Sequence, residues 1–403
     1  MRVIFHVDMD SFFASCEQQA CQSLRGRPIV VCGKQGSRSV IVASSREAKK
    51  LGIKTGMLPF EAKKIYPAII FVEPDGAKYE NISRRLIVIL KKYTEAVEVF
   101  SIDEAFLDMT GYVKTEAEAV SRAKKIKIEI VRELGEVVTA SVGIAGNKLL
   151  AKLASDINKP DGLFLINEQN QLEVLNYSKL TDFCGIGRRL EKHLLSLGID
   201  SVIKLREQPL VLLQQIFGSF CGQKLYNMAR GLDDSPVTPY FIETAVKSVG
   251  RSYTLPRNTF DKQEILVVLL HLCEKVGREL RRLKLTGRTV VIYWRYADFT
   301  HAGARQTFAR HLNDSAVFFQ FGEAKISKFR LARAVRLVGI QVSNLQDAGF
   351  CQLPLWLADR KRTELIPFLD KINDRYGELT VKPAFLLKLN KLRKKVGGFR
   401  LRD

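Results

Sequence analysis

The sequence has few of the features that mark secreted, membrane or zinc-binding proteins. Its seven cysteines form no Cys-x-x-Cys pair, and an odd number of scattered thiols is typical of a reducing compartment. The longest apolar run, residues 265–273, is about half as long as a membrane-spanning helix. His6, Asp8 and Asp10 interrupt the first apolar run, which no secretory signal tolerates. We therefore expect a cytoplasmic protein with no membrane segment, disulfide framework or structural zinc.

What the sequence has in excess is positive charge. Its 64 Lys and Arg residues outnumber 43 Asp and Glu residues, which leaves a net charge of +21. Such a surplus favours a polyanionic partner, because neutralising phosphates releases their counterions. A basic protein that is merely well solvated is the alternative. The hydrophobic content of 46% is sufficient for folding, and 403 residues suggest two to four domains.

The pattern of apolar residues divides the chain into modules. Up to about Gly162, strands alternate with helices, and a short basic β-rich segment followed by two helices, which ends near Pro67, reads as a small insertion. Residues 166–240 carry short helical patterns punctuated by glycine, which predicts a small helical domain. The order strand, helix, strand, strand, helix, strand follows in residues 246–346, and residues 347–403 form a tail. The fold class predicted is multidomain α/β (α+β).

Three carboxylates stand where strands are predicted to end or turn. Asp8 follows the first strand, and Asp103 and Glu104 lie at the tip of a predicted hairpin. A central antiparallel sheet can bring these positions together, and clustered carboxylates bind hard cations such as Mg²⁺. Two such ions about 3.5 to 4 Å apart activate an attacking hydroxyl and stabilise a leaving pyrophosphate. Taken alone, these acids have another interpretation: Asp8 could be a turn residue, and Asp103 and Glu104 could be an exposed pair in a loop.

Longer motifs surround these acids. They are VDMDSFFASCE at 7–17, SIDEAFLD at 101–108 and SVGIAGNKLLAKLASDINKPDG at 141–162. Together they resemble the Y-family DNA polymerases, in particular the DNA polymerase IV-like branch, and the resemblance covers about residues 1–346. It implies a right-hand polymerase with these parts: palm 1–12 and 75–165, fingers 13–74, thumb 166–240, linker and little finger 241–346, and a tail at 347–403.

The resemblance implies a template-directed DNA polymerase of low fidelity, without proofreading, that extends a primer 3′-OH past damaged template bases. Its partners would be primer-template DNA and deoxynucleoside triphosphates, and we expect a monomer. One alternative is a catalytically impaired accessory protein that binds DNA and a clamp. Another is a nucleotide cyclase-like enzyme, which would share the metal-binding acids but need no helix-hairpin-helix or basic second domain.

The resemblance also assigns the metal ligands. Asp8, the backbone carbonyl of Met9, Asp103 and Glu104 would bind two Mg²⁺ ions, with Mn²⁺ as an alternative. Asp10 has no ligand role by this analogy, and we expect it to make local turn or cap hydrogen bonds.

Four residues are expected to bind the incoming nucleotide. Phe13 occupies the aromatic position beneath the sugar, where a ring excludes a 2′-hydroxyl. Lys159 matches the palm lysine that faces the triphosphate. In the fingers the family motif Tyr-x-x-Arg is replaced by Arg46 and Lys49, which keeps the positive charge but loses the tyrosine and the guanidinium from their usual places. The alternative is that Arg46 and Lys49 form a solvated helix face.

Residues outside the palm and fingers are expected to bind DNA and a partner protein. Gly185 and Gly187 lie in a Gly-x-Gly turn of helix-hairpin-helix form, whose backbone N–H groups reach a DNA phosphate without reading sequence. The peptide formed by Gln352, Leu353, Pro354, Leu355 and Trp356 resembles the one with which bacterial polymerases dock on the sliding clamp. The basic residues expected to grip the duplex from the little finger are Lys247, Arg251, Arg295, Arg305, Arg333 and Arg336.

Overall fold

The computed structural model describes residues 2–33, 38–242, 245–350 and 357–388, with side chains left out for 357–363. The chain divides into two compact units after residue 243, and each is described by itself. In the described part of the chain, no helix has both the length and the apolar character needed to cross a membrane.

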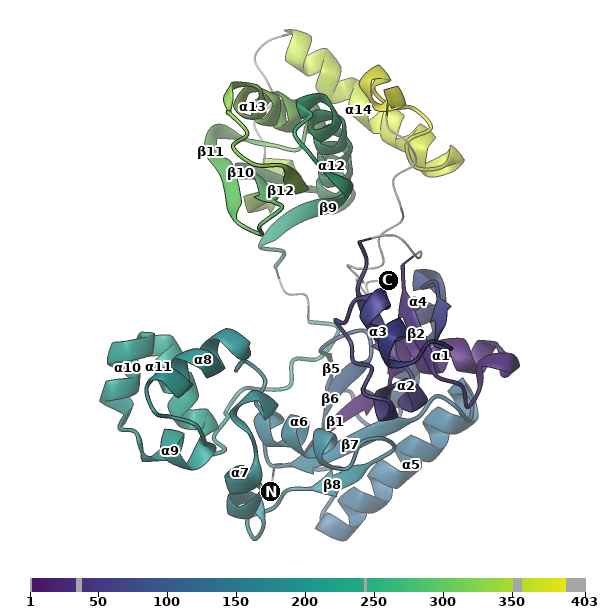
Figure 1. Cartoon of the computed structure of the whole chain (residues 1–403), viewed down its shortest axis with the longest axis vertical. Helices are drawn as coiled ribbons and strands as arrows, with labels where there is room; N and C mark the ends of the chain where they lie inside the picture. The colour runs from purple at the N-terminus through teal and green to yellow at the C-terminus, as the bar shows by residue number, and fades with distance from the viewer. Residues whose placement is uncertain (1, 34–37, 243–244, 351–356, 389–403) are drawn as a thin grey trace. The chain divides into compact units, whose positions relative to one another are not determined.

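The first unit is built on a five-stranded sheet with strand order β5-β6-β1-β7-β8 (Figure 1). Its strands are β1 (Ile4–Met9), β5 (Val97–Val99), β6 (Glu104–Asp108), β7 (Ala140–Ala145) and β8 (Leu163–Leu165). The central strand β1 is antiparallel to both neighbours. Its register places Asp8 opposite Glu104 on β6 and opposite Ser141 on β7. The end of the first strand therefore lies beside the acidic hairpin, as predicted.

Helices cover both faces of this central sheet. The helices α1 (Phe12–Ala20), α4 (Gly76–Leu90) and α5 (Glu116–Leu134) bury one face in a core that includes Phe5 and Val7 of β1. On the other face α6 (Lys148–Ile157) packs over Ile4 and Phe106. Because a strand alternates its side chains between faces, His6 and Asp8 lie on the α6 side.

An inserted subdomain follows α1. It has a small sheet of order β3-β2-β4, made of β2 (Ile29–Cys32), β3 (Ile41–Ser44) and β4 (Ile70–Val72), with helices α2 (Arg46–Lys50) and α3 (Pro59–Ile65). Strand β2 alternates as a strand between two layers should: Ile29 and Val31 face the core of the central sheet, and Val30 and Cys32 face α2 and α3. Helix α2 starts at Ser45, whose hydroxyl accepts a bond from Ala48 N.

A helical subdomain completes the first unit, as the sequence predicted. It contains α7 (Gln171–Tyr177), α8 (Arg188–Ser196), α9 (Val202–Glu207), α10 (Leu210–Phe217) and α11 (Ser219–Met228). Leu194, Leu205, Leu213 and Leu225 form its core, which continues into the layer above α6.

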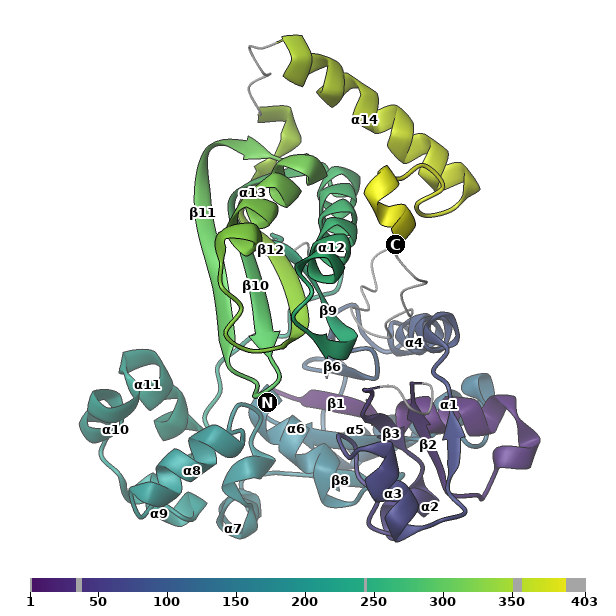
Figure 2. The same ribbon diagram turned by 45° about the horizontal axis from the view of Figure 1, so that its top comes forward.

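The second unit carries the predicted order of elements. These are β9 (Ser248–Thr259), α12 (Lys262–Arg282), β10 (Leu285–Tyr296), β11 (His301–Leu312), α13 (Ser315–Lys328) and β12 (Val335–Asp347), with sheet order β11-β10-β12-β9. Figure 2 shows α12 and α13 on one face of the sheet. Ile292, Trp294 and Ile340 are buried beneath these helices, and the outer face of the sheet carries neither helix.

The described part of the tail, residues 347–350 and 357–388, belongs to the second unit. Helix α14 (Leu357–Tyr376) lies along α12, where the Arg281 guanidinium binds both carboxylate oxygens of Asp370 at 2.5 and 3.0 Å. In the last turn of α14, the Asn373 side-chain amide accepts a bond from Val381 N and donates one to Val381 O, which fixes the turn that follows the helix. Leu386 is then buried between Val267 and Leu270 of α12.

Candidate active site

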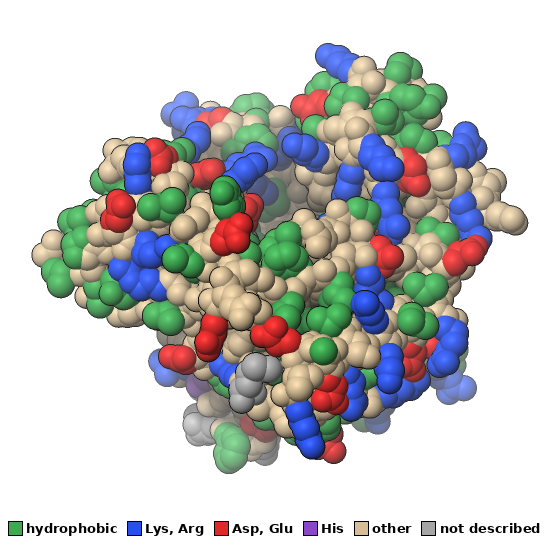
Figure 3. All heavy atoms as spheres, turned by 90° about the horizontal axis from the view of Figure 1, so that it is seen from below, with side chains coloured by type: hydrophobic (Ala, Val, Ile, Leu, Met, Phe, Trp, Pro, Cys, Tyr) green, Lys and Arg blue, Asp and Glu red, His purple; other side chains and the backbone are tan. Residues whose placement is uncertain are grey.

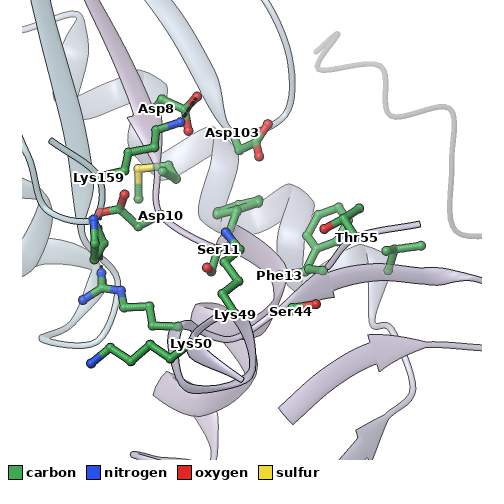
Figure 4. Close-up of a pocket in the computed structure, with 16 residues that line it drawn as sticks. Asp8, Asp10, Ser11, Phe13, Ser44, Lys49, Lys50, Thr55, Asp103 and Lys159 are labelled. Carbon is green, nitrogen blue, oxygen red and sulfur yellow. Dashed lines mark ion pairs between the residues drawn. The ribbon is translucent and has the colours of Figure 1, made fainter. Parts of the chain in front are cut away.

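A cavity of about 580 Å³ lies between the end of β1 and the inserted subdomain. Figure 4 shows Asp8 and Asp103 on one side of it and Lys49 and Lys50 on the other. Residues named from the sequence that line it are Asp8, Met9, Phe13, Arg46, Lys49, Asp103 and Lys159.

The carboxylates meet because two strand ends meet. The Met9 N–H donates to Asp103 O at 2.9 Å, which fixes the hairpin beside β1. Burial raises the pKa of Asp8 to about 6, against the opposing effect of Lys159, whose Nζ lies 2.9 Å from Asp8 Oδ2. Burial also raises the pKa of Asp103, although Ser101 donates a hydrogen bond to it. Both acids are therefore desolvated and in need of compensating positive charge.

Glu104 lies on the α6 side of the sheet and is held differently. Burial would raise its pKa, but hydrogen bonds from His6 and Lys152 outweigh burial and lower the pKa to about 2. His6 Nε2 is 3.1 Å from Glu104 Oε2, and its Nδ1 is 2.8 Å from Ser155 Oγ. Burial lowers the pKa of His6 itself. Glu104 is thus kept ionised behind the cavity.

A glycine allows α6 to supply these partners. A Cβ at Gly143 of β7 would stand 2.0 Å from Ala151 O and 2.3 Å from Ser155 N, so only glycine permits α6 to come this close. The approach brings Lys152 and Ser155 to Glu104 and His6.

The side chains fit a hard divalent cation. Ligand atoms of His6, Asp8 and Glu104 lie within 4.8 Å of one another, and Asp103 faces the same cavity. Carboxylate oxygens are the ligands that Mg²⁺ prefers. The sequence interpretation missed His6, although its i, i+2 spacing from Asp8 places both on one face of a strand.

Asp10 differs from the expectation of local hydrogen bonding. Its buried carboxylate accepts bonds from Thr139 Oγ1 (2.6 Å), Ser141 Oγ (2.8 Å) and Asp161 N (2.8 Å), all distant in sequence. It caps neither α1 nor its own turn, because the N-cap of α1 is Ser11, which makes no side-chain cap bond. Asp10 ties β7 and the loop of Lys159 to the end of β1.

Phe13 lies at the wall of the cavity, and Phe12 is buried in the core. The Phe13 ring stacks on Tyr79, with centroids 4.3 Å apart and planes 15° apart. Tyr79 is fixed in turn by its hydroxyl, which donates to Glu17 at 2.7 Å. The orientation of the Phe13 ring is therefore determined by buried neighbours.

Cationic side chains surround the rest of the cavity. Lys159 Nζ bridges Asp8 and Asp156 at 2.9 and 2.6 Å, and these carboxylates raise its pKa although burial opposes them. Burial lowers the pKa of Lys49. The Arg46 guanidinium reaches across to the central sheet, where it contacts Thr139 and lies 3.5 Å from Asp10. Lys50, which the sequence interpretation did not name, lines the cavity as well.

The Gly-x-Gly turn lies between a 3-10 turn (Leu180–Asp182) and α8. Gly185 has a φ of +114°, which a side chain would not tolerate, and Gly187 is the N-cap of α8. Lys224 of α11 lies close by, since a Cβ at Gly185 would stand 3.1 Å from its Nζ. The helix N-terminus and this ammonium group are both suited to a phosphate.

The basic residues of the second unit fall into two groups. Arg295 pairs with His301 and Arg305 with Val291, which places both arginines on the outer face of the sheet. Arg333 and Arg336 lie beside Arg295 at the loop that joins β10 to β11. Lys247 precedes β9, and the exposed Arg251 pairs with the buried Ile340 on the helix side of the edge strand.

Basic charge is also spread over the face drawn in Figure 3, where Lys and Arg side chains lie among acidic ones. The peptide of Gln352, Leu353, Leu355 and Trp356 lies outside the described residues.

The chain is similar to known proteins over nearly its whole length. The model of the impB/mucB/samB family matches residues 7–156, and that of its C-terminal domain matches 246–355. A third model, DNA polymerase-iota, thumb domain, matches 181–233. A DNA polymerase IV of Desulfatibacillum aliphaticivorans is 36% identical over 96% of this chain and 97% of its own. A DNA polymerase IV of Moorella thermoacetica is 36% identical over 94% of this chain and 95% of its own.

Solved structures agree with these relatives. A Y-family DNA polymerase chimera of Dbh and Dpo4 is 30% identical with a TM-score of 0.74, covering 85% of this chain and 98% of that one. DinB from Sulfolobus solfataricus is 29% identical with a TM-score of 0.56 and the same coverage. The chain therefore belongs to the Y family of DNA polymerases, in its DNA polymerase IV-like branch. It is a DNA-directed DNA polymerase that carries out translesion synthesis, as the sequence predicted, and the accessory-protein alternative is not favoured.

Proposed function

We propose that the cavity is the nucleotidyl-transfer site and that Asp8, Asp103, Glu104 and the Met9 carbonyl hold two Mg²⁺ ions, or Mn²⁺ in their place. The observation that carries this proposal is the pairing of Asp8 with Glu104, with Asp103 hydrogen-bonded to Met9 beside them. When bound, the ions would supply Lewis-acid chemistry, lowering the pKa of the primer 3′-OH and neutralising the charge of the leaving pyrophosphate. Lys159 and Lys152 hold the ionised carboxylates until then.

The protein groups around the cavity orient the nucleotide. Phe13, fixed by Tyr79, would lie under the sugar and exclude a 2′-hydroxyl. Lys49 and Lys159 would bind the triphosphate from opposite sides of the cavity. Arg46 would close this ring of positive charge from its position beside Asp10.

The parts of the hand follow from the elements. We assign the central sheet with α4 to α6 to the palm (1–12 and 75–165), and the inserted subdomain to the fingers (13–74). We assign α7 to α11 to the thumb (166–240), and the second sheet to the linker and little finger (241–346). Helix α1 buries Phe12 and Ala14 in the palm core, so the fingers share one core with the palm at this helix. Residues 347–403 are the tail that carries the clamp peptide.

The remaining assignments concern DNA and partners. Gly185 and Gly187 would bind a backbone phosphate without reading sequence. Lys247, Arg251, Arg295, Arg305, Arg333 and Arg336 would hold the duplex backbone, whose charge supplies most of the affinity. Gln352, Leu353, Leu355 and Trp356 would dock a monomeric polymerase on the sliding clamp in the cytoplasm.

Primer extension tests the proposal. The intact protein, Mg²⁺ and four deoxynucleotides should extend a primer on a defined template. The double variant Asp103→Ala, Glu104→Ala should lose extension by at least about 10³-fold, since a metal site stripped of its ligands loses the stabilisation of the transition state. DNA binding by the double variant should be unchanged. If the double variant still extends the primer, Asp103 and Glu104 are not metal ligands and the proposed metal site is wrong.

A further inference from the structure

The loop between β10 and β11 presents an aromatic ring that the reaction above does not use. Phe299 is 57% exposed. Its backbone has a φ of 67°, in the left-handed region that bulky residues rarely adopt. Glycine or asparagine would stand there at lower conformational cost. Backbone strain of this kind is typical of functional positions, where the surrounding structure enforces it.

The loop that enforces this conformation is tightly hydrogen-bonded. Asp298 Oδ1 accepts bonds from Thr300 N at 3.0 Å and Thr300 Oγ1 at 2.7 Å. Tyr296 N donates to Thr300 O at 2.9 Å, and Phe299 N donates to Tyr296 O at 3.0 Å. Arg333 forms an ion pair with the other oxygen of Asp298. The backbone that carries the ring is therefore held in one conformation, which lowers the conformational entropy lost when a ligand binds to the loop.

Two guanidinium groups lie within a short distance of the ring. Arg336 lies 4.9 Å and Arg295 5.6 Å from the ring centroid, within the range of a cation–π contact. Arg295 Nε is buried and, within the described residues, has no hydrogen-bond partner. The site therefore combines an exposed apolar ring with two positive charges.

We propose that Phe299, Arg295 and Arg336 form a stacking site for an unpaired base of single-stranded DNA. Every base has a π-face, so an aromatic ring binds unpaired bases without sequence preference, and nearby arginines bind the adjoining phosphate. Bases inside a duplex are already stacked on each other, so the ring selects single strands, whereas Arg305 on the open sheet face contacts any phosphate. The proposal rests on the proposed binding of DNA by the little finger.

Fluorescence anisotropy of the full chain with two labelled probes tests this site. One probe is a blunt duplex, and the other is the same duplex with a single-stranded 5′ template overhang. Phe299→Ala should weaken binding of the overhang probe roughly tenfold and leave the blunt duplex unchanged. Phe299→Trp should restore binding, and Phe299→Leu, which keeps apolar volume without a π-face, should not. Equal weakening on both probes would show that the ring has a structural role only and would overturn the proposal.

Three controls separate the possible causes. An overhang of abasic sites should bind the wild type and Phe299→Ala equally, because the ring would have no base to stack on. Phe260→Ala removes a ring of similar exposure, 62%, from another loop of the same unit and should change neither probe. Phe299→Gly relieves the left-handed strain, so it should keep or raise Tm while it still loses overhang affinity.

Failure of this site is distinguishable from failure of the little-finger proposal. Arg305→Ala should weaken both probes. If Arg305→Ala weakens both and Phe299→Ala weakens neither, the stacking site alone is wrong. If neither substitution has an effect, binding of DNA by the little finger is wrong as well.

Discussion

The two sheets of this polymerase differ in how helices cover them and in the sign of the charge they carry. The palm sheet is covered by helices on both faces, so the acids at the end of β1 are desolvated, and each one is held by a lysine, a histidine or a hydroxyl. The little-finger sheet is covered by α12 and α13 on one face, and its outer face carries the exposed Arg305 and, four positions further along β10 from its partner Val291, Arg295. Burial makes charges reactive and fixed in position, whereas exposure leaves them able to bind a polyanion with little desolvation cost. Changes in the palm and fingers should therefore alter nucleotide selection or chemistry, and changes in the little finger should alter DNA affinity.

The largest effect within this comparison is expected at Phe13. Phe13→Ala removes the ring that would collide with a 2′-hydroxyl, so incorporation of ribonucleotides relative to deoxynucleotides should rise about 10- to 200-fold, the range for steric discrimination by a few atoms. Steady-state kinetics with dCTP and CTP measure this ratio. Phe71→Leu, in the core of the inserted subdomain and outside the cavity lining, is the matched control and should leave it unchanged. An unaltered ratio in Phe13→Ala would remove the assignment of this residue as the sugar gate.

Lys49 should have a smaller effect of a different kind. Lys49→Ala removes one charged contact to the triphosphate, so the apparent KM for nucleotide should rise about tenfold while Tm stays constant. Arg46→Ala should also raise KM, but it should lower Tm because the guanidinium binds Thr139 and lies beside buried Asp10. Lys63→Ala, on the exposed side of α3, is the control. Unchanged KM values in both variants would show that Arg46 and Lys49 do not bind the nucleotide, which is the alternative of a solvated helix face.

The smallest effect is expected in the little finger. Arg305→Ala should weaken duplex binding a few-fold and reduce the slope of log K against log salt by about 1, because one phosphate contact is lost. Extension at saturating DNA should proceed at the wild-type rate. A changed rate with unchanged affinity would contradict the division of labour between the two sheets.

Local sequence patterns predicted much of the fold. Helix α5 falls in the stretch where strands and helices were expected to alternate, and it is bounded by Thr115, whose hydroxyl caps it, and by Gly135 at a φ of 110°. The meeting of Asp8 with the hairpin acids was also predicted, since register in an antiparallel sheet follows from strands that end at the same edge.

Contacts between distant segments could not be predicted in this way. Nothing near Asp10 indicates that Thr139, Ser141 and Asp161 will converge on it. The partnership of His6 with Ser155 depends on how closely α6 approaches Gly143, which is a property of packing. The docking of the tail on α12 likewise depends on an ion pair between residues 89 positions apart in the chain.

The docked tail would keep a clamp that is bound to the proposed peptide close to the second unit. The proposed clamp peptide lies between η3 (Ala348–Phe350) and α14, and both belong to the same unit. Fully extended, the chain from Phe350 to Leu357 spans no more than roughly 25 Å. The peptide is joined to the second unit at both of its ends. A clamp bound to it would therefore be kept at a high effective concentration beside the little finger. The clamp would then hold the polymerase near the primer after each dissociation from it. Processivity would depend on the length of this tether as well as on the affinity of the polymerase for DNA.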